Sequence, residues 1–451
     1  NSAEHWPARR ITLALSPASV PKRGSGFDLA MAAAVLAANG VIEPSELADR
    51  VLIGELGLDG RVRAVPGILP SLLTAARAGI TRAVVPGANL GEAQLLPDLE
   101  TAGVASLADL ILMLKGELYD SGEVTDLTAR DRPTGPDLRD VAGQVAGRTA
   151  MEVAAAGGHH VFLLGPPGAG KTMLAERLTG LLPDLNLDEA LEVTAVHSIA
   201  GLLPPGQPLI TRPPFQDPHH TATVAAVVGG GSGVARPGAA TLAHQGVLFL
   251  DEAPEFKRGV LDALRQPLES GCLTLRRVGG TAIYPARFTL VLAANPCPCA
   301  LDRCTCPPES RRRYLSRLSG PLLDRVDLHV EVGAVSRLDL VTEDGRGEPT
   351  ASVAERVALA RERSTARLRG TPWRTNGQVP PVELRRRWPL PARSTAPLDA
   401  AIDRGLLTAR GFGRVTRVAW TLADLAGVDQ PGPEQIAHAL GFRLGHRAAA
   451  A

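Results

Sequence analysis

The chain has 451 residues, of which 45% are hydrophobic and 21% charged, a composition typical of globular proteins and not of disordered chains. Lys and Arg number 48 and Asp and Glu 47, so the net charge of +1 excludes a uniformly basic nucleic-acid coat protein and a strongly acidic tail protein. Apolar runs such as residues 29–38 are too short to cross a bilayer, which takes ~20 residues. At ~150 residues per domain, we expect two to four domains in a soluble, cytoplasmic protein.

Charge is distributed unevenly along the chain. Residues 351–451 contain 16 Arg, no Lys and 8 acidic residues, a net charge of +8, which leaves −7 for residues 1–350. Such an asymmetry favours a polyanionic partner for the C-terminal part. The alternative is a bias of composition, because Arg outnumbers Lys by 44 to 4 over the whole chain.

Residues 1–118 alternate short apolar runs with helical ones, which predicts a mixed domain of strands and helices. Residues 119–137 are polar and contain Gly and Pro, which is typical of a linker. The predicted strands are residues 11–15, 51–56 and 83–85, and the predicted helices are residues 29–38 and 69–78.

Residues 138–335 have the pattern of an α/β domain with a parallel sheet, because apolar strands alternate with loops rich in Gly, Pro or acidic residues. Residues 336–351 form a second polar hinge, and residues 352–451 are expected to form a helical domain. The strands are predicted at residues 161–164, 247–250 and 288–293, and two C-terminal helices at residues 353–368 and 414–425.

A phosphate-binding loop is predicted between the strand at 161–164 and a helical stretch at 173–182, the order that such loops require. Glycines let backbone N–H groups close around phosphate oxygens, Lys171 supplies positive charge to the β- and γ-phosphates, and the Thr172 hydroxyl reaches Mg²⁺. Only four lysines occur in the chain, so a chance Lys at this position is improbable. The residues predicted to bind ATP are Gly165, Pro166, Pro167, Gly168, Ala169, Gly170, Lys171 and Thr172.

Polar side chains follow the next two strands. Asp251 comes directly after residues 247–250, where α/β sheets place ligands, so we expect it to hold Mg²⁺ together with Thr172. Glu252 is suited to polarise an attacking water. The alternative is an ordinary strand followed by acidic turn residues. The phosphate-binding loop in the same domain disfavours this alternative. Asn295 follows residues 288–293 and can hold the attacking water against the γ-phosphate.

Arg325 ends the run Leu-Leu-Asp-Arg. An arginine here can act as a finger across a subunit boundary, a role worth ~10³–10⁵ in rate. The alternative for an isolated arginine is an exposed residue at the end of a helix.

This order of motifs resembles an AAA+ ATPase, and longer runs resemble the magnesium-chelatase-like ComM/YifB family over essentially the whole chain. The resemblance implies a homo-oligomeric, hexameric ring with ATP and Mg²⁺ between its subunits. It also implies that the chain is N-terminally truncated, since the family begins with a stretch that precedes Asn1. The runs that carry it are residues 140–144, 218–220, 242–252, 264–269, 295–299, 319–325 and 419–425.

The resemblance also implies roles for single residues. Lys171 and Thr172 belong to Walker A and Asp251 and Glu252 to Walker B. Asn295 is sensor 1 and Arg325 the trans-acting finger. Sensor 2 is Arg410 or Arg414, of which we favour Arg410, because the family pattern S-x-R-x-x-x-R corresponds to residues 408–414 with Thr in place of Ser.

Two insertions are further implied. An insert in helix 2 is expected around residues 212–237, and a pre-sensor-1 hairpin at residues 272–286 with its turn at 278–280. Such loops point into the channel of a ring. Arg276 and Arg277 lie on the hairpin and are candidates to contact phosphates there; the alternative is a solvated hairpin face.

Residues 1–118 resemble the catalytic domain of Lon protease in the runs 21–28 and 53–62. Proteolysis of that type needs a Ser nucleophile activated by a Lys. The nucleophile position falls on Gly26 and the Lys position on Leu69, and residues 51–90 contain no Lys. We therefore predict an inactive Lon-protease-like α+β domain with a structural or DNA-contacting role, and not a protease.

Four of the five cysteines lie within ten residues, in the pattern C-x-C-x₄-C-x-C. Four thiolates at short spacing suit a tetrahedral structural Zn²⁺ site, although C-x₂-C is the usual spacing. The alternative is a set of free thiols in a reducing cytosol. The candidate zinc ligands are Cys297, Cys299, Cys304 and Cys306; Cys272 is expected in the core, and the pairs 159–160 and 219–220 are expected to be polar loop histidines.

The resulting hypothesis is an ATP-hydrolysing AAA+ ring motor that acts on DNA, as the branch-migration helicases of natural transformation do. The DNA role follows from the resemblance, with independent support from the basic C-terminal part and the hairpin arginines. One alternative is a chelatase-like motor subunit that remodels a protein partner, and another is a scaffold that uses ATP as an assembly switch. The expected partners are copies of the chain and DNA, with no membrane.

Overall fold

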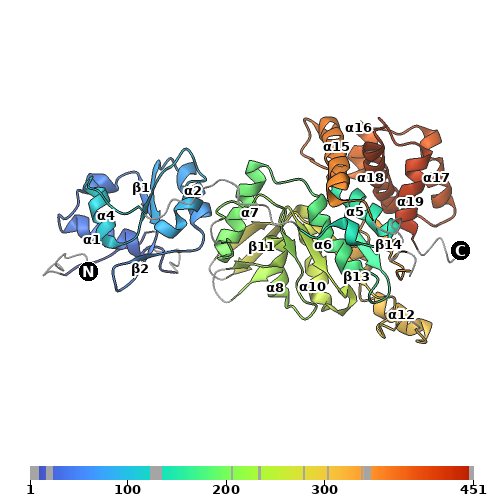
Figure 1. The fold of residues 1–451 in the computed structure, drawn as a ribbon, viewed down its shortest axis with the longest axis horizontal. Coiled ribbons are helices and arrows are strands. Elements are labelled where there is room, and N and C mark those ends of the chain that lie inside the picture. Colours follow the sequence, from blue (N-terminus) through green and yellow to red (C-terminus); the bar gives the residue numbers. More distant parts are fainter. Residues whose placement is uncertain are drawn as a thin grey trace.

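The computed structural model describes residues 10–16, 24–121, 135–204, 207–231, 235–277, 280–301, 304–336, 339 and 347–445. Three parts follow one another in space in chain order, with the first part at one end and the C-terminal helices at the other (Figure 1). Within the described residues, no helix combines the length and the apolar character that crossing a membrane requires.

The first part contains a three-stranded parallel sheet in the order β1-β4-β5, flanked by short helices. Leu29 and Ala33 of α1 and Leu110 of α4 pack under this sheet with Val84 and Val104. Its elements are α1 (Asp28–Ala38), β1 (Arg50–Leu52), β2 (Glu55–Leu56), β3 (Val62–Arg63), α2 (Ile68–Arg77), β4 (Arg82–Pro86), α3 (Leu90–Ala93), β5 (Glu100–Val104) and α4 (Leu107–Leu114).

Two strand predictions in this part need correction. Residues 11–15 form no strand, because they pair with none of the described strands and expose Leu13 and Leu15, so neither hydrogen bonds nor burial fix them. The predicted strand at 51–56 is broken, since Ile53 still donates to the carbonyl of Val84 whereas the Gly54 N–H turns to the carbonyl of Gly26. The chain then enters the separate β2–β3 hairpin.

The central part is built on a five-stranded parallel sheet in the order β14-β6-β13-β10-β7. The predicted strands are confirmed within one residue at each end. Every residue of β6, β10 and β13 is buried, which explains their continuous apolar runs. The strands are β6 (Val161–Leu164), β7 (Phe215–Gln216), β10 (Val247–Leu250), β13 (Thr289–Ala294) and β14 (Leu328–Glu331).

Helices cover both faces of this sheet, and two hairpins extend from it. The hairpins are β8 (Gly229–Gly230) with β9 (Arg236–Pro237), and β11 (Cys272–Arg277) with β12 (Gly280–Pro285). The helices are α5 (Val145–Gly157), α6 (Lys171–Leu181), α7 (Leu187–Ala200), α8 (Val224–Val228), α9 (Ala239–Leu242), α10 (Arg258–Ala263), α11 (Arg265–Ser270), α12 (Pro308–Leu315) and α13 (Gly320–Leu323).

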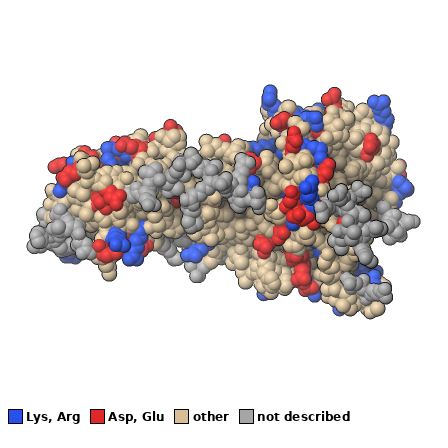
Figure 2. Space-filling view, viewed as in Figure 1, with Lys and Arg blue, Asp and Glu red and all other residues tan. Residues whose placement is uncertain are grey.

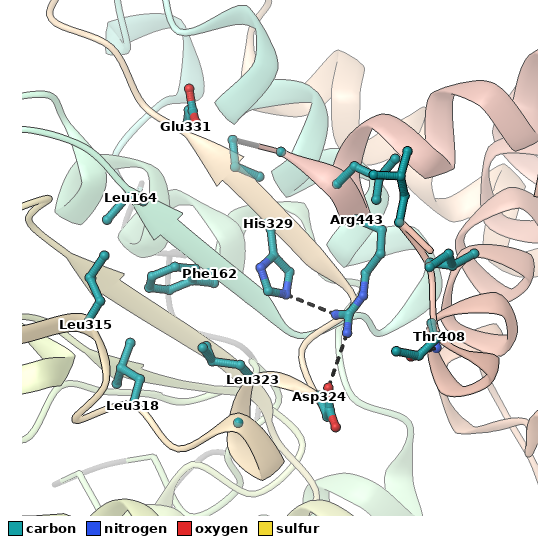
Figure 3. A pocket seen from close by; sticks show the side chains of 17 residues that line it. Phe162, Leu164, Leu315, Leu318, Leu323, Asp324, His329, Glu331, Thr408 and Arg443 are labelled. Carbon is teal, nitrogen blue, oxygen red and sulfur yellow. Dashed lines mark hydrogen bonds and ion pairs between the residues drawn. The ribbon is translucent and has the colours of Figure 1, made fainter. Parts of the chain in front are cut away.

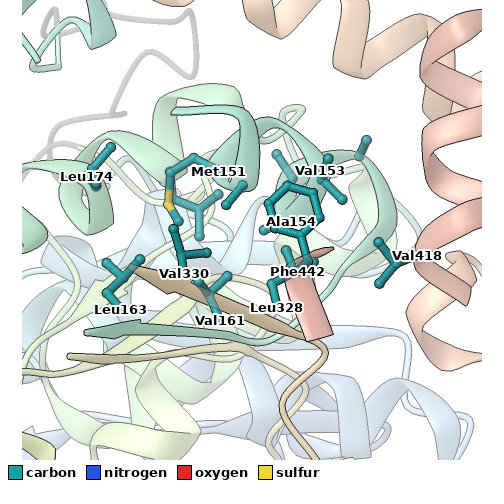
Figure 4. Packing of buried hydrophobic residues seen from close by; sticks show 14 of the residues in the cluster. Met151, Val153, Ala154, Val161, Leu163, Leu174, Leu328, Val330, Val418 and Phe442 are labelled. Carbon is teal, nitrogen blue, oxygen red and sulfur yellow. The ribbon is translucent and has the colours of Figure 1, made fainter. Parts of the chain in front are cut away.

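The C-terminal part is helical, as expected, and packs directly on the central sheet. Alternate residues of β6 and β14 point to the side of α5, where Val418 and Phe442 from the C-terminal helices join the same apolar core (Figure 4). Burial of this shared core holds the two parts together. The helices are α15 (Thr350–Leu368), α16 (Pro381–Arg387), α17 (Ala392–Asp403), α18 (Ala409–Ala426) and α19 (Pro433–Leu444).

Ion pairs between the same two parts neutralise some of the C-terminal arginines. Arg356 of α15 pairs with Glu152 of α5 at 2.7 Å, and Arg374 pairs with Glu189. In the face shown in Figure 2, Lys and Arg side chains are spread over the helical part instead of forming one patch. The acidic body of the chain is therefore itself a partner of the Arg-rich part, and the +8 charge is weaker evidence for a polyanion than the sequence suggested.

A buried polar network reinforces this contact. His159 Nδ1 lies 2.8 Å from Asp327 Oδ2, its Nε2 lies 2.7 Å from Thr421 Oγ1, and Arg414 pairs with Asp327 at 3.0 Å. Burial alone would raise the pKa of Asp327, but Arg414 and the His159 hydrogen bond outweigh it and hold the pKa below its ordinary range. His159 lies in the loop between α5 and β6, as predicted, and its side chain is fully buried there.

Candidate nucleotide-binding site

The loop at 165–170 joins β6 to α6, in the position predicted for a phosphate-binding loop. Gly168 and Gly170 have φ values of +74° and +88°, in the left-handed region where a side chain is disfavoured. A Cβ at Gly165 would lie 2.1 Å from the carbonyl oxygen of Val332. These glycines therefore shape a tight turn that ends at the N-terminus of α6, where backbone N–H groups favour anions.

Lys171 is buried at the first position of α6, with 7% of its surface exposed. Its Nζ donates to the carbonyls of Gly165 and Pro166, both at 2.8 Å, and to Asn295 Oδ1 at 3.0 Å. Burial lowers the pKa of Lys171, while Asp251 and Glu252 act in the opposite direction. The structure thus places the predicted sensor Asn295 directly beside the lysine of the phosphate-binding loop.

Thr172 and Asp251 meet across the end of the sheet. The Thr172 hydroxyl donates to Asp251 Oδ2 at 3.0 Å, and the other carboxylate oxygen accepts from the Glu252 N–H at 2.8 Å. A hydroxyl and a carboxylate oxygen at this separation are hard oxygen ligands of the kind that Mg²⁺ prefers. The two residues therefore fit the predicted metal position.

Glu252 stands at the end of β10 in a strained backbone conformation. Its φ is +49°, a value that is uncommon for residues other than glycine and that concentrates at functional sites. Its carboxylate is half-exposed, and its Oε2 lies 3.2 Å from Nδ1 of His220. The sequence analysis missed this contact, although one signal was present: the pair His219–His220 follows β7, the strand next to β10.

Asn295 follows the last residue of β13, the strand between β6 and β10. It is 9% exposed. Because parallel strands end at the same edge of the sheet, this position brings Asn295 between the lysine loop and the acidic pair. The structure therefore brings Lys171, Thr172, Asp251 and Asn295 together.

The predicted arginines lie apart from this group. Arg325, just after α13, pairs with Glu269 and also donates to the carbonyl of Pro321. Arg410, at the start of α18, lies 3.7 Å from Asp324, and its side chain is 83% exposed. Burial and then the neighbouring positive charges lower the pKa of Arg325. Because Arg410 pairs with Asp324, the residue before Arg325, the two arginines lie in the same region. Arg414 instead contributes to the buried network at Asp327.

A pocket of about 290 Å³ is lined by Asp324, the partner of Arg410, and by Arg443 (Figure 3). Its lining is mostly apolar, from β6, β14, α13 and the start of α18. At its rim, Arg443 donates to His329 Nε2 at 3.0 Å and pairs with Asp324 at 3.6 Å. Burial, and secondly Arg443, lowers the pKa of His329 to about 4. None of the residues of the phosphate-binding loop line the pocket, so the pocket is separate from the predicted ATP site.

Four cysteines converge in the loop between β13 and α12. The sulfur atoms of Cys297, Cys299, Cys304 and Cys306 all lie within 4.8 Å of one another, and Cys297 is buried. Tetrahedral zinc with Zn–S bonds of ~2.3 Å requires sulfurs ~3.8 Å apart, so this set needs only small movements to bind one ion. The Cys306 N–H and then the neighbouring Cys297 thiol lower the pKa of Cys304 to about 6. Cys272 lies outside the cluster.

The hairpin β11–β12 is present at the predicted position. Arg276 is exposed on β11 and pairs in register with Thr281 of β12. The predicted turn residues Val278 and Gly279 and the side chain of Arg277 lie outside the described residues. At the other end of the hairpin, the buried Tyr284 donates its hydroxyl to the carbonyl of Ala235 at 2.6 Å, which links β12 to the β8–β9 region.

Comparisons with known proteins agree with this arrangement. Three family models match in succession: subunit ChlI of Mg-chelatase over residues 1–89, magnesium chelatase subunit ChlI over 137–340, and the ChlI C-terminal model over 347–443. An uncharacterized protein of Mycobacterium tuberculosis is 53% identical over 452 residues, covering 98% of this chain and 88% of its own length.

Two further relatives carry names. Competence protein ComM of Haemophilus influenzae is 40% identical over 450 residues, covering 98% of this chain and 87% of its own length. The YifB protein of Escherichia coli is 40% identical over 449 residues, with coverage of 98% and 87%. The chain therefore belongs to the ComM/YifB family of magnesium-chelatase-like AAA+ ATPases.

Proposed function

We propose that the protein is an ATP-hydrolysing ring motor that acts on DNA, in the manner of a branch-migration helicase. The observation that carries the ATPase is the convergence of Lys171, Thr172, Asp251 and Asn295 at one edge of the sheet. The DNA role is supported by the exposed Arg276 on the hairpin and by similarity to a protein named for competence.

Each residue of the site has one proposed task. Lys171 and the loop 165–170 hold the phosphates, and Thr172 and Asp251 hold Mg²⁺, which neutralises charge on the phosphates when bound. Glu252 accepts the proton of the attacking water, and Asn295 orients that water from beside Lys171. We assign sensor 2 to Arg410, because Arg414 is held in the buried network by Asp327.

The arginines support an assembly of several copies, which we propose to be a hexameric ring. Arg325 and Arg410 share a surface on the side of α13 and α18, and neither is in contact with the loop 165–170 of its own chain among the described residues. A subunit placed against this surface would receive both positive charges at its own phosphates. The ATP site is then complete only between two copies.

The N-terminal part is proposed to be a non-proteolytic relative of Lon-type domains. The hydroxyl of Ser25 donates to the carboxylate of Glu55, and no lysine occurs in residues 51–90 to act as a base. The Ser25 hydroxyl faces a carboxylate and not an amine, so the arrangement is not the Ser–Lys dyad of Lon-type proteases, and we assign this part to assembly or DNA contact.

The proposed DNA contact gives one prediction about the hairpin. Replacing Arg276 and Arg277 by Ala should leave the basal ATPase rate intact and remove stimulation by DNA, because the ATP site lies on the sheet edge. Binding titrations at several salt concentrations give the slope of the logarithm of the DNA-binding constant against the logarithm of the salt concentration. If both residues contact phosphates, this slope should be about 2 units less steep in the variant than in the wild type. The control is the Arg312/Arg313 double Ala variant, which removes two exposed arginines from α12. Unchanged stimulation in the hairpin variant would contradict the assignment.

The cysteine cluster gives a second prediction. We expect about one Zn²⁺ per chain, held by Cys297, Cys299, Cys304 and Cys306, because four thiolates at this separation form a closed structural site. Metal analysis of protein made in zinc-replete medium without chelators measures the content directly. Replacing Cys304 and Cys306 by Ser should abolish binding, whereas Cys272→Ser, outside the cluster, should retain it. Metal-free wild-type protein would refute the site.

A further inference from the structure

The cysteine cluster begins next to the ATP site. Asn295, whose Oδ1 accepts from Lys171 Nζ at 3.0 Å, is separated from Cys297 by a single residue, Pro296. Cys297 is buried, and its sulfur lies within 4.8 Å of the other three sulfurs of the cluster. The proposed zinc site and the residue proposed to orient the attacking water therefore adjoin each other in the chain.

The sheet holds the chain only as far as the end of β13. Ala294 pairs in register with Leu164, and its carbonyl accepts from the N–H of Gly165 at 3.1 Å. Among the described residues of the stretch 295–306, one hydrogen bond joins two backbone groups, from the Ala300 N–H to the Cys297 carbonyl at 3.3 Å. Within the described chain, neither a strand nor a helix therefore fixes Asn295 from its C-terminal side.

Two prolines make the connection between Asn295 and the cluster stiff. Pro296 and Pro298 each fix their own φ and disfavour the helical conformation in the residue before them, which is Asn295 in one case and Cys297 in the other. The backbone between Asn295 and Cys299 therefore has few alternative conformations. A change in the position of the first two cysteines is passed to Asn295.

The rest of the loop is also held on the side of the cluster. Arg311 of α12 donates to the carbonyl of Cys304 at 3.4 Å, which ties the second cysteine pair to that helix. Between the two pairs, Ala300 has a φ of +51°, a value that is uncommon for residues other than glycine and that persists where the surrounding structure imposes it. Coordination of one ion by both pairs supplies a restraint of this kind.

We propose that the four cysteines of the cluster, when they hold zinc, are positioning residues that fix Asn295 beside Lys171. Without the metal, the loop no longer holds Asn295 at the place from which it orients the attacking water. The loop 165–170, Lys171 and Thr172 belong to other segments of the chain, so ATP still binds. The proposal rests on the ATPase and on the zinc site proposed above, and it makes ATP turnover depend on zinc.

The first test measures zinc content, ATP affinity and turnover in the same proteins. In the Cys304→Ser/Cys306→Ser variant, kcat should fall about 10–10²-fold, the loss that a misplacement of about 1 Å produces, while the affinity for a fluorescent ATP analogue stays within about twofold of the wild type. Cys272→Ser, outside the cluster, should keep both its zinc and its kcat. Removal of zinc from the wild type by a chelator, with Mg²⁺ in excess in every assay, should lower kcat, and added zinc should restore it. This reversal separates loss of the metal from misfolding of a variant.

The second test determines whether the cluster acts through Asn295. Asn295→Ala should lower kcat by a similar factor and still contain zinc. Adding Cys304→Ser and Cys306→Ser to Asn295→Ala should lower kcat no further, because both changes remove the same contribution. A cluster that only stabilises the fold would act independently of Asn295, so the two losses would multiply.

The outcomes separate this coupling from the proposals on which it rests. Wild-type turnover in protein freed of zinc, or losses that multiply in the combined variant, would overturn the coupling and leave the zinc site and the ATPase standing. A wild type that contains no zinc would overturn the site and the coupling together. A zinc-loaded wild type that does not hydrolyse ATP would overturn the proposed ATPase and, with it, the coupling.

Discussion

The Glu252→Gln protein is expected to bind ATP about as well as the wild type and to hydrolyse it about 10²–10⁴-fold more slowly. Lys171 contacts phosphate in the ground state, so Lys171→Ala should lose binding. Glu252 acts on water only in the transition state, so its loss should affect kcat and spare binding. Binding of a fluorescent ATP analogue and single-turnover phosphate release measure the two effects separately.

The same turn of the chain offers a control for that experiment. Glu255 lies three residues after Glu252 and pairs with Arg317 at 2.8 Å. Glu255→Gln removes an equal charge and should keep hydrolysis near the wild-type rate. If Glu252→Gln hydrolysed ATP at the wild-type rate, a different group would have to accept the proton of water.

Arg325→Ala is expected to lower turnover by about 10³–10⁵-fold while ATP binding persists. Arg325 pairs with Glu269 and contacts no residue of the loop 165–170 among the described residues, so we propose that it acts on ATP bound to a neighbouring subunit. Mixing Arg325→Ala with Lys171→Ala subunits should therefore recover part of the activity, because some interfaces then combine an intact loop with an intact arginine.

The mixing experiment needs two checks. Arg312 is an exposed arginine on α12, and Arg312→Ala should keep full activity. This result would show that the loss of one surface charge does not by itself lower ATP turnover. Mixed assembly has to be verified by differently tagged subunits. Mixed rings that remain inactive at every ratio would contradict a finger that acts between subunits.

The sequence predicted the parts of the site that depend on local order. A buried strand, a glycine loop and a lysine at the start of a helix are contiguous, so the position of Lys171 could be read from the chain. Asp251 and Asn295 were placed beside it because parallel strands end at one edge of a sheet. In the structure, Asp251 accepts a hydrogen bond from Thr172, and Asn295 accepts one from Lys171.

Features that depend on distant pairing were not predictable in the same way. Nothing near His220 in the sequence indicates Glu252, because their contact depends on the pairing of β7 with β10 across 30 residues. Similarly, the burial of His159 depends on Asp327, which directly precedes β14, and on Thr421 of α18. Residues 11–15 have the pattern of a strand, but a pattern cannot supply the neighbouring strand that would pair with them.

The measurement that tests the central claim most directly is the steady-state rate of ATP hydrolysis with no DNA, with single-stranded DNA, with duplex DNA and with a branched junction. A motor that acts on DNA should turn over ATP faster when DNA is present, and the exposed Arg276 of the β11–β12 hairpin is the proposed DNA contact. We predict stimulation by at least one of these DNAs and its loss in the Arg276/Arg277 double variant. Equal rates under all four conditions, from protein that hydrolyses ATP, would contradict a DNA motor and favour a protein substrate.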